Sequence, residues 1–314
     1  MRYRLKQWGA LLCAGICLTG LCGCGGNAVP PDDPLYPEQE NLASIHIEEA
    51  WSAGLTGRGV TIGIIDSGAA EHEDLDMRRI SGKSYVDEDT ASFTDTRGHG
   101  TFITGLLAAT RNNGKGIAGM TVSSIRVYKV LGDQPHIGAD HVAQAIRDAA
   151  DDGCGVINLS MGTPNENAKL QKAIEYALSK NVIVVAAAGG DSKTPYYPAA
   201  YDGVIGVDVV SADLQALETG VNNESVDVTA PGEGIVGLNL FGGYDREGAG
   251  ASYAAAQVTA MAAFAKQERP EMNAQEFLEL LKTSVEDKGE AGYDTAYGWG
   301  VIDFGLFTQT IKGA

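Results

Sequence analysis

Three short segments of the chain carry side chains that could together cleave an acyl bond. They are Ile65-Asp66-Ser67-Gly68, Gly98-His99-Gly100-Thr101 and Gly250-Ala251-Ser252-Tyr253-Ala254. A serine hydroxyl is a weak nucleophile until an imidazole takes its proton, and the imidazole needs a carboxylate that fixes its tautomer. Asp66, His99 and Ser252 supply that carboxylate, base and nucleophile in this order along the chain. The segments therefore predict a catalytic triad.

Each candidate side chain stands at the boundary of a predicted element. Asp66 follows the apolar run 60–65, which is typical of a buried strand, and His99 opens a predicted helix over 99–110. Ser252 precedes a predicted helix over 254–266. Strand ends and helix starts are the places where an α/β sheet presents functional side chains. Each segment alone is common in turns and helix caps, so only their combination indicates chemistry.

The remaining pattern alternates apolar runs with amphipathic stretches. Strands are predicted over 122–131, 156–160, 182–187, 204–210 and 225–230, and helices over 45–53, 139–151, 167–180 and 273–283. Alternating βαβ units imply a parallel sheet covered on both faces. We therefore expect a three-layer α/β fold, with a mainly parallel sheet, helices on both faces and no internal repeat.

Composition restricts the partners of the chain. Its 314 residues carry 23 Lys and Arg against 41 Asp and Glu, a formal net charge of −18. Such an acidic surface argues against nucleic acid as a partner, because phosphate binding requires a positive surface. We expect a monomer that acts on peptide or protein substrates and requires no cofactor.

Beyond the triad, the chain resembles the subtilisin-like serine proteases, the subtilases, from about residue 44 to residue 307. The other matching segments, in chain order, are Ala50-Trp51, Thr56-Gly57-Arg58-Gly59-Val60, Asn158-Leu159-Ser160-Met161-Gly162, Ala230-Pro231-Gly232 and Tyr297-Gly298-Trp299-Gly300-Val301-Ile302-Asp303. The resemblance implies the subtilisin-like fold and a serine endopeptidase. It implies that Ser252 attacks the peptide carbonyl, that His99 relays the proton and that Asp66 orients His99.

The resemblance also identifies how a substrate would be held, and where this chain departs from the family. It implies that Ser160, Met161 and Gly162 bind the substrate backbone as an added strand. Where the family has Ala-Ala-Gly-Asn, this chain has Gly190 in the place of the asparagine that donates to the oxyanion. In subtilisin itself, loss of that donor lowers turnover by about 10²–10³-fold.

The substitution leaves several readings open. The enzyme is slow or specialised, or Asp191 occupies the position in protonated form, or the protein is a catalytically degenerate subtilase that binds peptides without cutting them. The backbone N–H of Ser252 would still donate to an oxyanion in each case.

The resemblance also points to one candidate calcium site. Asp74 and the Asn113 loop fall where one family site would lie, and oxygen ligands suit calcium. The same loop, Asn112-Asn113-Gly114, is ordinary turn chemistry, and no other metal site is expected.

The N-terminus is typical of an exported bacterial protein. Three positive residues precede the uncharged run 9–23, and Leu21-Cys22-Gly23-Cys24 is similar to a lipobox. We predict a lipoprotein signal peptide over 1–23, lipidation of Cys24, a Pro-rich tether over 24–43 and a catalytic domain over 44–314. The predicted location is the extracellular face of the cell membrane; the alternative is a secreted protein with an ordinary signal peptide.

Overall fold

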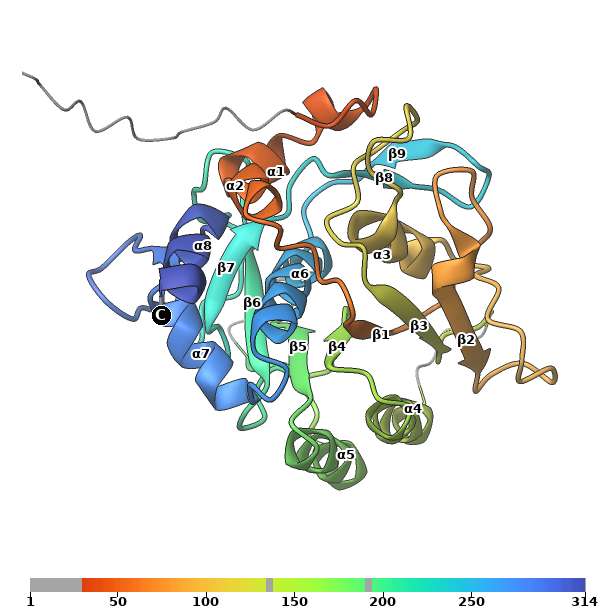
Figure 1. Ribbon diagram of the computed structural model, residues 1–314. Helices are drawn as coiled ribbons and strands as arrows, with labels where there is room; N and C mark the ends of the chain where they lie inside the picture. The colour runs from red at the N-terminus through yellow and green to blue at the C-terminus, as the bar shows by residue number, and fades with distance from the viewer. Residues whose placement is uncertain (1–29, 134–137, 190–193, 314) are drawn as a thin grey trace, which may run out of the picture.

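A computed structural model of the chain describes residues 30–133, 138–189 and 194–313. Its central sheet has the strand order β10-β11-β7-β6-β5-β4-β1-β3-β2 over these residues. Figure 1 labels the part from β7 to β2. The strands are β1 (Thr61–Asp66), β2 (Ile80–Ser84), β3 (Ser124–Lys129), β4 (Val156–Leu159), β5 (Ile183–Ala187), β6 (Ile205–Val210), β7 (Val228–Pro231), β10 (Val285–Glu286) and β11 (Val301–Ile302). All neighbours pair in parallel except β10 and β11.

Helices cover both faces of this sheet. One face packs against α4 (Ala139–Asp151) and α5 (Ala168–Ser179), which lie together in Figure 1. The other packs against α3 (His99–Ala108) and the long α6 (Ala251–Glu268), with α1 (Glu40–Ser44), α2 (Ile47–Ser52), α7 (Ala274–Lys282) and α8 (Phe304–Gly313) around them. Because the pleat alternates, Ile64 of β1 faces α6 and Ile65 faces α4, and both are fully buried. Burial on both faces explains the unbroken apolar run before Asp66.

The predicted three-layer α/β architecture is confirmed, and the long elements lie where the sequence places them. The structure adds elements that the pattern does not predict: β2, β10, β11, α8 and the hairpin of β8 (Val236–Leu238) and β9 (Tyr244–Arg246). Most of these are two- to three-residue strands with too few residues to show a period. The hairpin lies against α3, beside the predicted site (Figure 1).

The boundary predicted between tether and domain at residue 43 is wrong. Within the predicted tether, Tyr36 and Leu42 are buried in the core, and α1 continues across the boundary. Asp33 accepts hydrogen bonds from the backbone N–H groups of Asn112 and Asn113 at 2.9 and 3.2 Å. These apolar and polar contacts outweigh the Pro-rich, acidic composition that suggested an extended linker.

The signal peptide and Cys24 lie outside the described residues. Among the residues that the structure does describe, no helix is both long and apolar enough to span a bilayer.

Candidate active site

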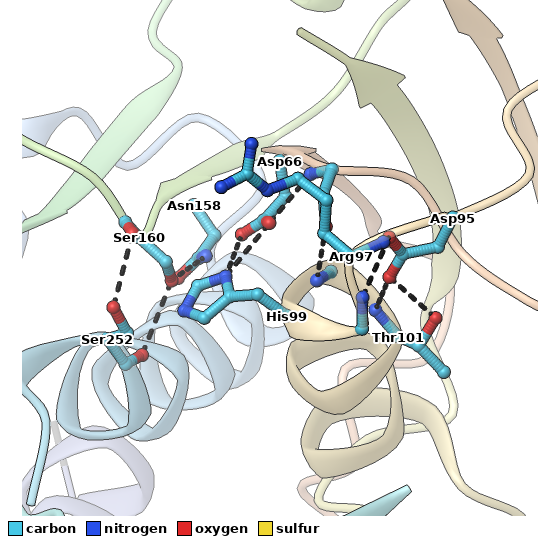
Figure 2. Close-up of polar contacts among 11 residues, drawn as sticks. Asp66, Asp95, Arg97, His99, Thr101, Asn158, Ser160 and Ser252 are labelled. Atoms are coloured by element: carbon cyan, nitrogen blue, oxygen red, sulfur yellow. Dashed lines mark hydrogen bonds and ion pairs between the residues drawn. The ribbon is translucent and has the colours of Figure 1, made fainter. Parts of the chain in front are cut away.

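The base of the predicted triad is held by its carboxylate. Asp66 ends β1 and is fully buried, and His99 is the first residue of α3. His99 Nδ1 lies 2.9 Å from both Asp66 carboxylate oxygens (Figure 2). The charge of Asp66 raises the pKa of His99, against the opposing effect of burial. The His99 side chain is still 35% exposed, so its other nitrogen is open to a substrate.

A second buried aspartate fixes the start of α3. Asp95 accepts from the backbone N–H groups of Arg97, Gly98 and Thr101 at 2.8–3.0 Å and from the Thr101 hydroxyl at 2.8 Å (Figure 2). Burial opposes ionisation of Asp95, but these donors hold its pKa below the usual value. Asp95 is not among the residues predicted from the sequence. Its signal is an acidic side chain one turn before a predicted helix, which is typical of a cap.

The end of β1 and the start of α3 touch directly. The Gly100 N–H donates to Ser67 Oγ at 2.9 Å, and a Cβ at Gly100 would lie 2.2 Å from the Gly68 carbonyl oxygen. Only glycine fits at this approach, which explains why a glycine must follow the histidine. The close contact brings Asp66 and His99 together although 32 residues separate them in the chain.

The candidate nucleophile, Ser252, is held by longer hydrogen bonds than His99. Ser252 is the second residue of α6, and its hydroxyl donates to the Ser160 carbonyl at 3.1 Å, while the Ser160 hydroxyl donates to the Ser252 carbonyl at 3.3 Å. In the described part of the chain, Ser252 and His99 form no hydrogen bond, although Figure 2 shows the imidazole between Asp66 and Ser252. Rotation about the Cα–Cβ bond of Ser252 is needed to direct Oγ at the imidazole; catalytic hydrogen bonds commonly tighten only when substrate binds.

A buried relay positions Ser160. Thr259 of α6 donates to Asn158 Oδ1 at 2.9 Å, and Asn158 Nδ2 donates to Ser160 Oγ at 2.8 Å. Asn158 and Thr259 are fully buried. The relay ties the end of β4 to α6 and so connects the nucleophile to the predicted substrate edge.

The predicted substrate edge follows the end of β4. Residues 160–162 continue the line of β4 beyond the sheet, where Ser160 is buried, Met161 is half-buried and Gly162 is exposed. In the described residues, the backbone groups of Met161 and Gly162 form no hydrogen bond. An extended peptide can therefore pair with them.

The structure does not place every predicted site residue. Gly190 and Asp191 lie outside the described residues. Of the groups predicted to surround the oxyanion, the structure therefore describes only the Ser252 N–H. That N–H belongs to the first turn of α6, where helical amides have no partner within the helix.

Asp74 and Asn113 do meet. Asn113 Nδ2 donates to Asp74 Oδ1 at 2.7 Å, and the Ile117 N–H donates to Oδ2 at 3.0 Å. Burial raises the pKa of Asp74, with a further rise from the charge of Asp33. The carboxylates of Asp74 and Asp33 form no ion pair with any described residue. Oxygen ligands suit a hard cation, but both carboxylates already accept hydrogen bonds, and the described residues contain no cluster of three or more His, Cys, Asp or Glu suited to a metal.

The geometry of the site agrees with the comparisons with known proteins. The model of the subtilase family matches residues 57–300, which hold all three triad residues. The chain belongs to the subtilase family. Subtilisin BL from Lederbergia lenta is 30% identical to this subtilase over 264 residues, which are 83% of the chain and 95% of that relative.

Other relatives are longer. The minor extracellular protease Epr of Bacillus subtilis (strain 168) is 33% identical over 270 residues, and the major intracellular serine protease of the same strain is 34% identical over 209 residues. These alignments cover 85% and 63% of this subtilase, but 41% and 65% of the relatives. The chain thus spans less than two thirds of either relative.

Solved structures show the same fold. Fervidolysin from Fervidobacterium pennivorans, a keratinolytic enzyme related to subtilisin, has a TM-score of 0.80 at 26% identity, over 88% of this subtilase and 46% of fervidolysin. A protease from Pseudoalteromonas arctica PAMC 21717 also has a TM-score of 0.80, at 24% identity, over 90% of this chain and all of its own.

Proposed function

We propose that this subtilase is a serine endopeptidase that acts as a monomer on peptide or protein substrates. The observation that carries the proposal is the paired contact of His99 Nδ1 with both oxygens of the buried Asp66, beside a serine at the start of α6. Asp66 keeps the proton on Nδ1, so the other nitrogen of His99 is free to accept one.

The residues then have distinct parts in the reaction. A substrate pairs with residues 160–162, and its carbonyl carbon lies near Ser252. Ser252 Oγ leaves the Ser160 carbonyl, passes its proton to His99 and attacks that carbon. The imidazolium, which Asp66 stabilises, then protonates the leaving amine. Water hydrolyses the acyl-enzyme by the reverse proton path, and the Ser252 N–H donates to the oxyanion at each stage.

A fluorophosphonate probe with a peptide library tests this proposal on the full chain in detergent. We expect labelling of Ser252 and cleavage of a subset of peptides, and we expect Ser252→Ala to lose both. Peptide binding without any turnover that depends on Ser252 would instead establish the peptide-binding alternative.

We further propose that turnover is slow, because glycine at position 190 offers no side-chain donor to the oxyanion. Gly190→Asn should raise kcat on a cleaved peptide, by up to about 10²-fold if the restored amide reaches the oxyanion. An unchanged or lower kcat would mean that another donor already serves. Gly190→Ala, which adds no donor, is the matched control.

We propose that the protein is held on the extracellular face of the membrane by acylation of Cys24. The lipobox-like segment supports this, and several acyl chains on one cysteine give a stable anchor where one chain does not. Cys24→Ser should release the protein from the membrane fraction or block its export, and mass spectrometry of the wild-type N-terminus should detect the acyl group. An unmodified N-terminus would contradict the anchor and favour a secreted protein.

We also propose that calcium, though not required for catalysis, binds at Asp74 and Asn113 and stabilises the fold. The proximity of these two side chains and the lack of an ion pair between Asp74 and any described residue support this. Millimolar Ca²⁺ should raise the Tm of the wild type and not that of Asp74→Asn. Equal Tm values with Ca²⁺ and with a chelator would contradict the site.

A further inference from the structure

A cavity of about 270 Å³ opens beside His99 between α3 and the β8–β9 hairpin. Its apolar walls are Phe102, Leu238, Leu240 and Tyr253, and its lining includes no residue of the substrate edge 160–162. The catalytic mechanism uses none of these walls. The cavity therefore lies next to the reacting atoms without belonging to the edge that holds the acyl half of a substrate.

The position of the cavity identifies the part of a substrate that reaches it. Residues 160–162 hold the chain before the cleaved bond, on one side of Ser252. His99 protonates the leaving amine, so the residue after the cleaved bond must lie against His99. The cavity borders His99 and Tyr253, the residue after the nucleophile. It is placed to receive the first side chain of the leaving half.

The floor of the cavity is rigid and apolar. Phe102 is 4% exposed and Leu238 is fully buried, and a Cβ at Gly237 would lie 2.6 Å from the Phe102 ring, so β8 packs directly on that ring. The Tyr253 ring stands 4.9 Å from Phe102 and 6.4 Å from His99, centroid to centroid. These surfaces suit a long aliphatic stem.

The rim of the cavity is acidic because side chains along β9 alternate between its two faces. Tyr244 and Arg246 face away from the cavity, since the Tyr244 hydroxyl donates to Asp74 and Arg246 pairs with Glu38 at 2.9 Å. Asp245 and Glu247 point the other way and line the cavity. Glu247 lies near Tyr253: burial raises the pKa of Tyr253 to about 12, and the charge of Glu247 adds to that rise.

The rim carries two carboxylates, Asp245 and Glu247, against one cation, Arg97. Asp245 accepts a hydrogen bond from the Asn239 amide at 3.0 Å. Arg97 also lines the cavity, but its guanidinium donates to the Gly132 carbonyl at 3.1 Å, on the loop after β3. Glu247 forms no ion pair with any described residue. An apolar floor beneath a carboxylate is the environment that a lysine or arginine side chain fills best.

We propose that this cavity binds the side chain of the residue immediately after the cleaved bond, and that Glu247 selects lysine or arginine there. The proposal rests on the proposed protease activity and names a specificity-determining residue for it. The cationic head meets Glu247 at the rim while the stem lies along Phe102 and Tyr253.

The test uses the full chain in detergent and a peptide that it cleaves. Peptides that differ only in the residue after the cut, as Lys, Arg, Gln or Glu, are compared by kcat/KM. We expect Lys and Arg to be cleaved faster than Gln, and Glu to be cleaved slowest. Glu247→Gln should lower the Lys-to-Gln ratio by about threefold to fivefold, as for a solvent-exposed ion pair, and Glu247→Lys should invert the Lys-to-Glu preference.

A distant variant separates this local effect from the general field of an acidic protein. Glu175→Gln removes the same charge from the exposed face of α5 and should leave the ratio unchanged. An unchanged ratio in Glu247→Gln, or an equal fall in Glu175→Gln, would overturn the inference alone. The absence of any cleavage that depends on Ser252 would instead overturn the proposed function, and this inference with it.

Discussion

The two halves of the active site differ in how firmly hydrogen bonds hold their side chains. In the histidine half, Asp66 holds His99 through both oxygens, and Asp95 accepts four donors at the start of α3. In the serine half, Ser252 has two longer contacts with Ser160, and its hydroxyl donates to the Ser160 carbonyl rather than to the base. The base is thus organised before substrate binds, whereas the nucleophile has to turn.

This difference has an energetic reason. The imidazolium that forms during the reaction must be stabilised without reorganisation of the protein, so its carboxylate has to be fixed in advance. A hydroxyl rotates about one single bond at low cost, so the serine half needs no such rigidity. The comparison predicts that substitutions in the histidine half cost more than equivalent substitutions in the serine half.

The largest expected effect is that of Asp66→Asn. The amide would no longer hold His99 in the tautomer that accepts the proton of Ser252, and kcat/KM should fall by about 10⁴-fold, as in other triads. Fluorogenic peptide assays measure this, and circular dichroism checks that the fold is retained. A loss of less than about tenfold would show that His99 does not depend on Asp66. It would also contradict the expectation that the histidine half is the more sensitive one.

The next effect is that of Asp95→Asn, which places an amide nitrogen against the N–H and hydroxyl of Thr101. His99 should shift with the start of α3, and kcat should fall by about 10–10²-fold with little change in KM. The control Asp89→Asn alters an exposed turn in which Asp89 accepts from the Ala91 N–H. If both variants behave alike, Asp95 does not position His99.

A smaller effect is expected in the serine half. Thr259→Val removes the donor to the buried Asn158 and should cost about 1–3 kcal/mol of unfolding free energy, but should lower kcat by less than about tenfold. Thr104→Val is the matched control, because Thr104 is fully buried and its hydroxyl has no partner among the described residues. A loss of kcat as large as that of Asp95→Asn would mean that the serine half is equally preorganised.

The smallest effect is a shift in pH dependence. Because Asp66 raises the pKa of His99, kcat/KM should fall in acid with a midpoint above about 6.5, the usual histidine value. Protonated His99 stabilises the fold, so its contribution to stability is full below about pH 6.5 and is lost as pH rises through the folded pKa. NMR titration of His99 should show a lower pKa in Asp66→Asn; an unchanged pKa would contradict this electrostatic assignment.

The sequence by itself determined the long elements and the three candidate triad residues. The mostly apolar run 60–65 is typical of a buried strand. Asp66 stands at the end of that strand, and His99 and Ser252 stand at the starts of predicted helices. The same local signals could not show that residues 36–42 pack on the core, because their Pro and acidic content is equally typical of a linker. That was decided by long-range contacts: Gln39 exchanges hydrogen bonds with the backbone of Ala118, 79 residues away, and the neighbouring Asp33 accepts from the N–H groups of Asn112 and Asn113.

Tertiary structure alone decided the finer parts of the site. Asp95, Thr259 and Glu247 are ordinary polar residues in the sequence, and nothing in their spacing points to the active site. The roles that we propose for them arise because α3, α6 and the β8–β9 hairpin converge on the ends of β1 and β4. The sequence encodes which side chains can do chemistry, whereas the distances between elements far apart in the chain decide which of them meet.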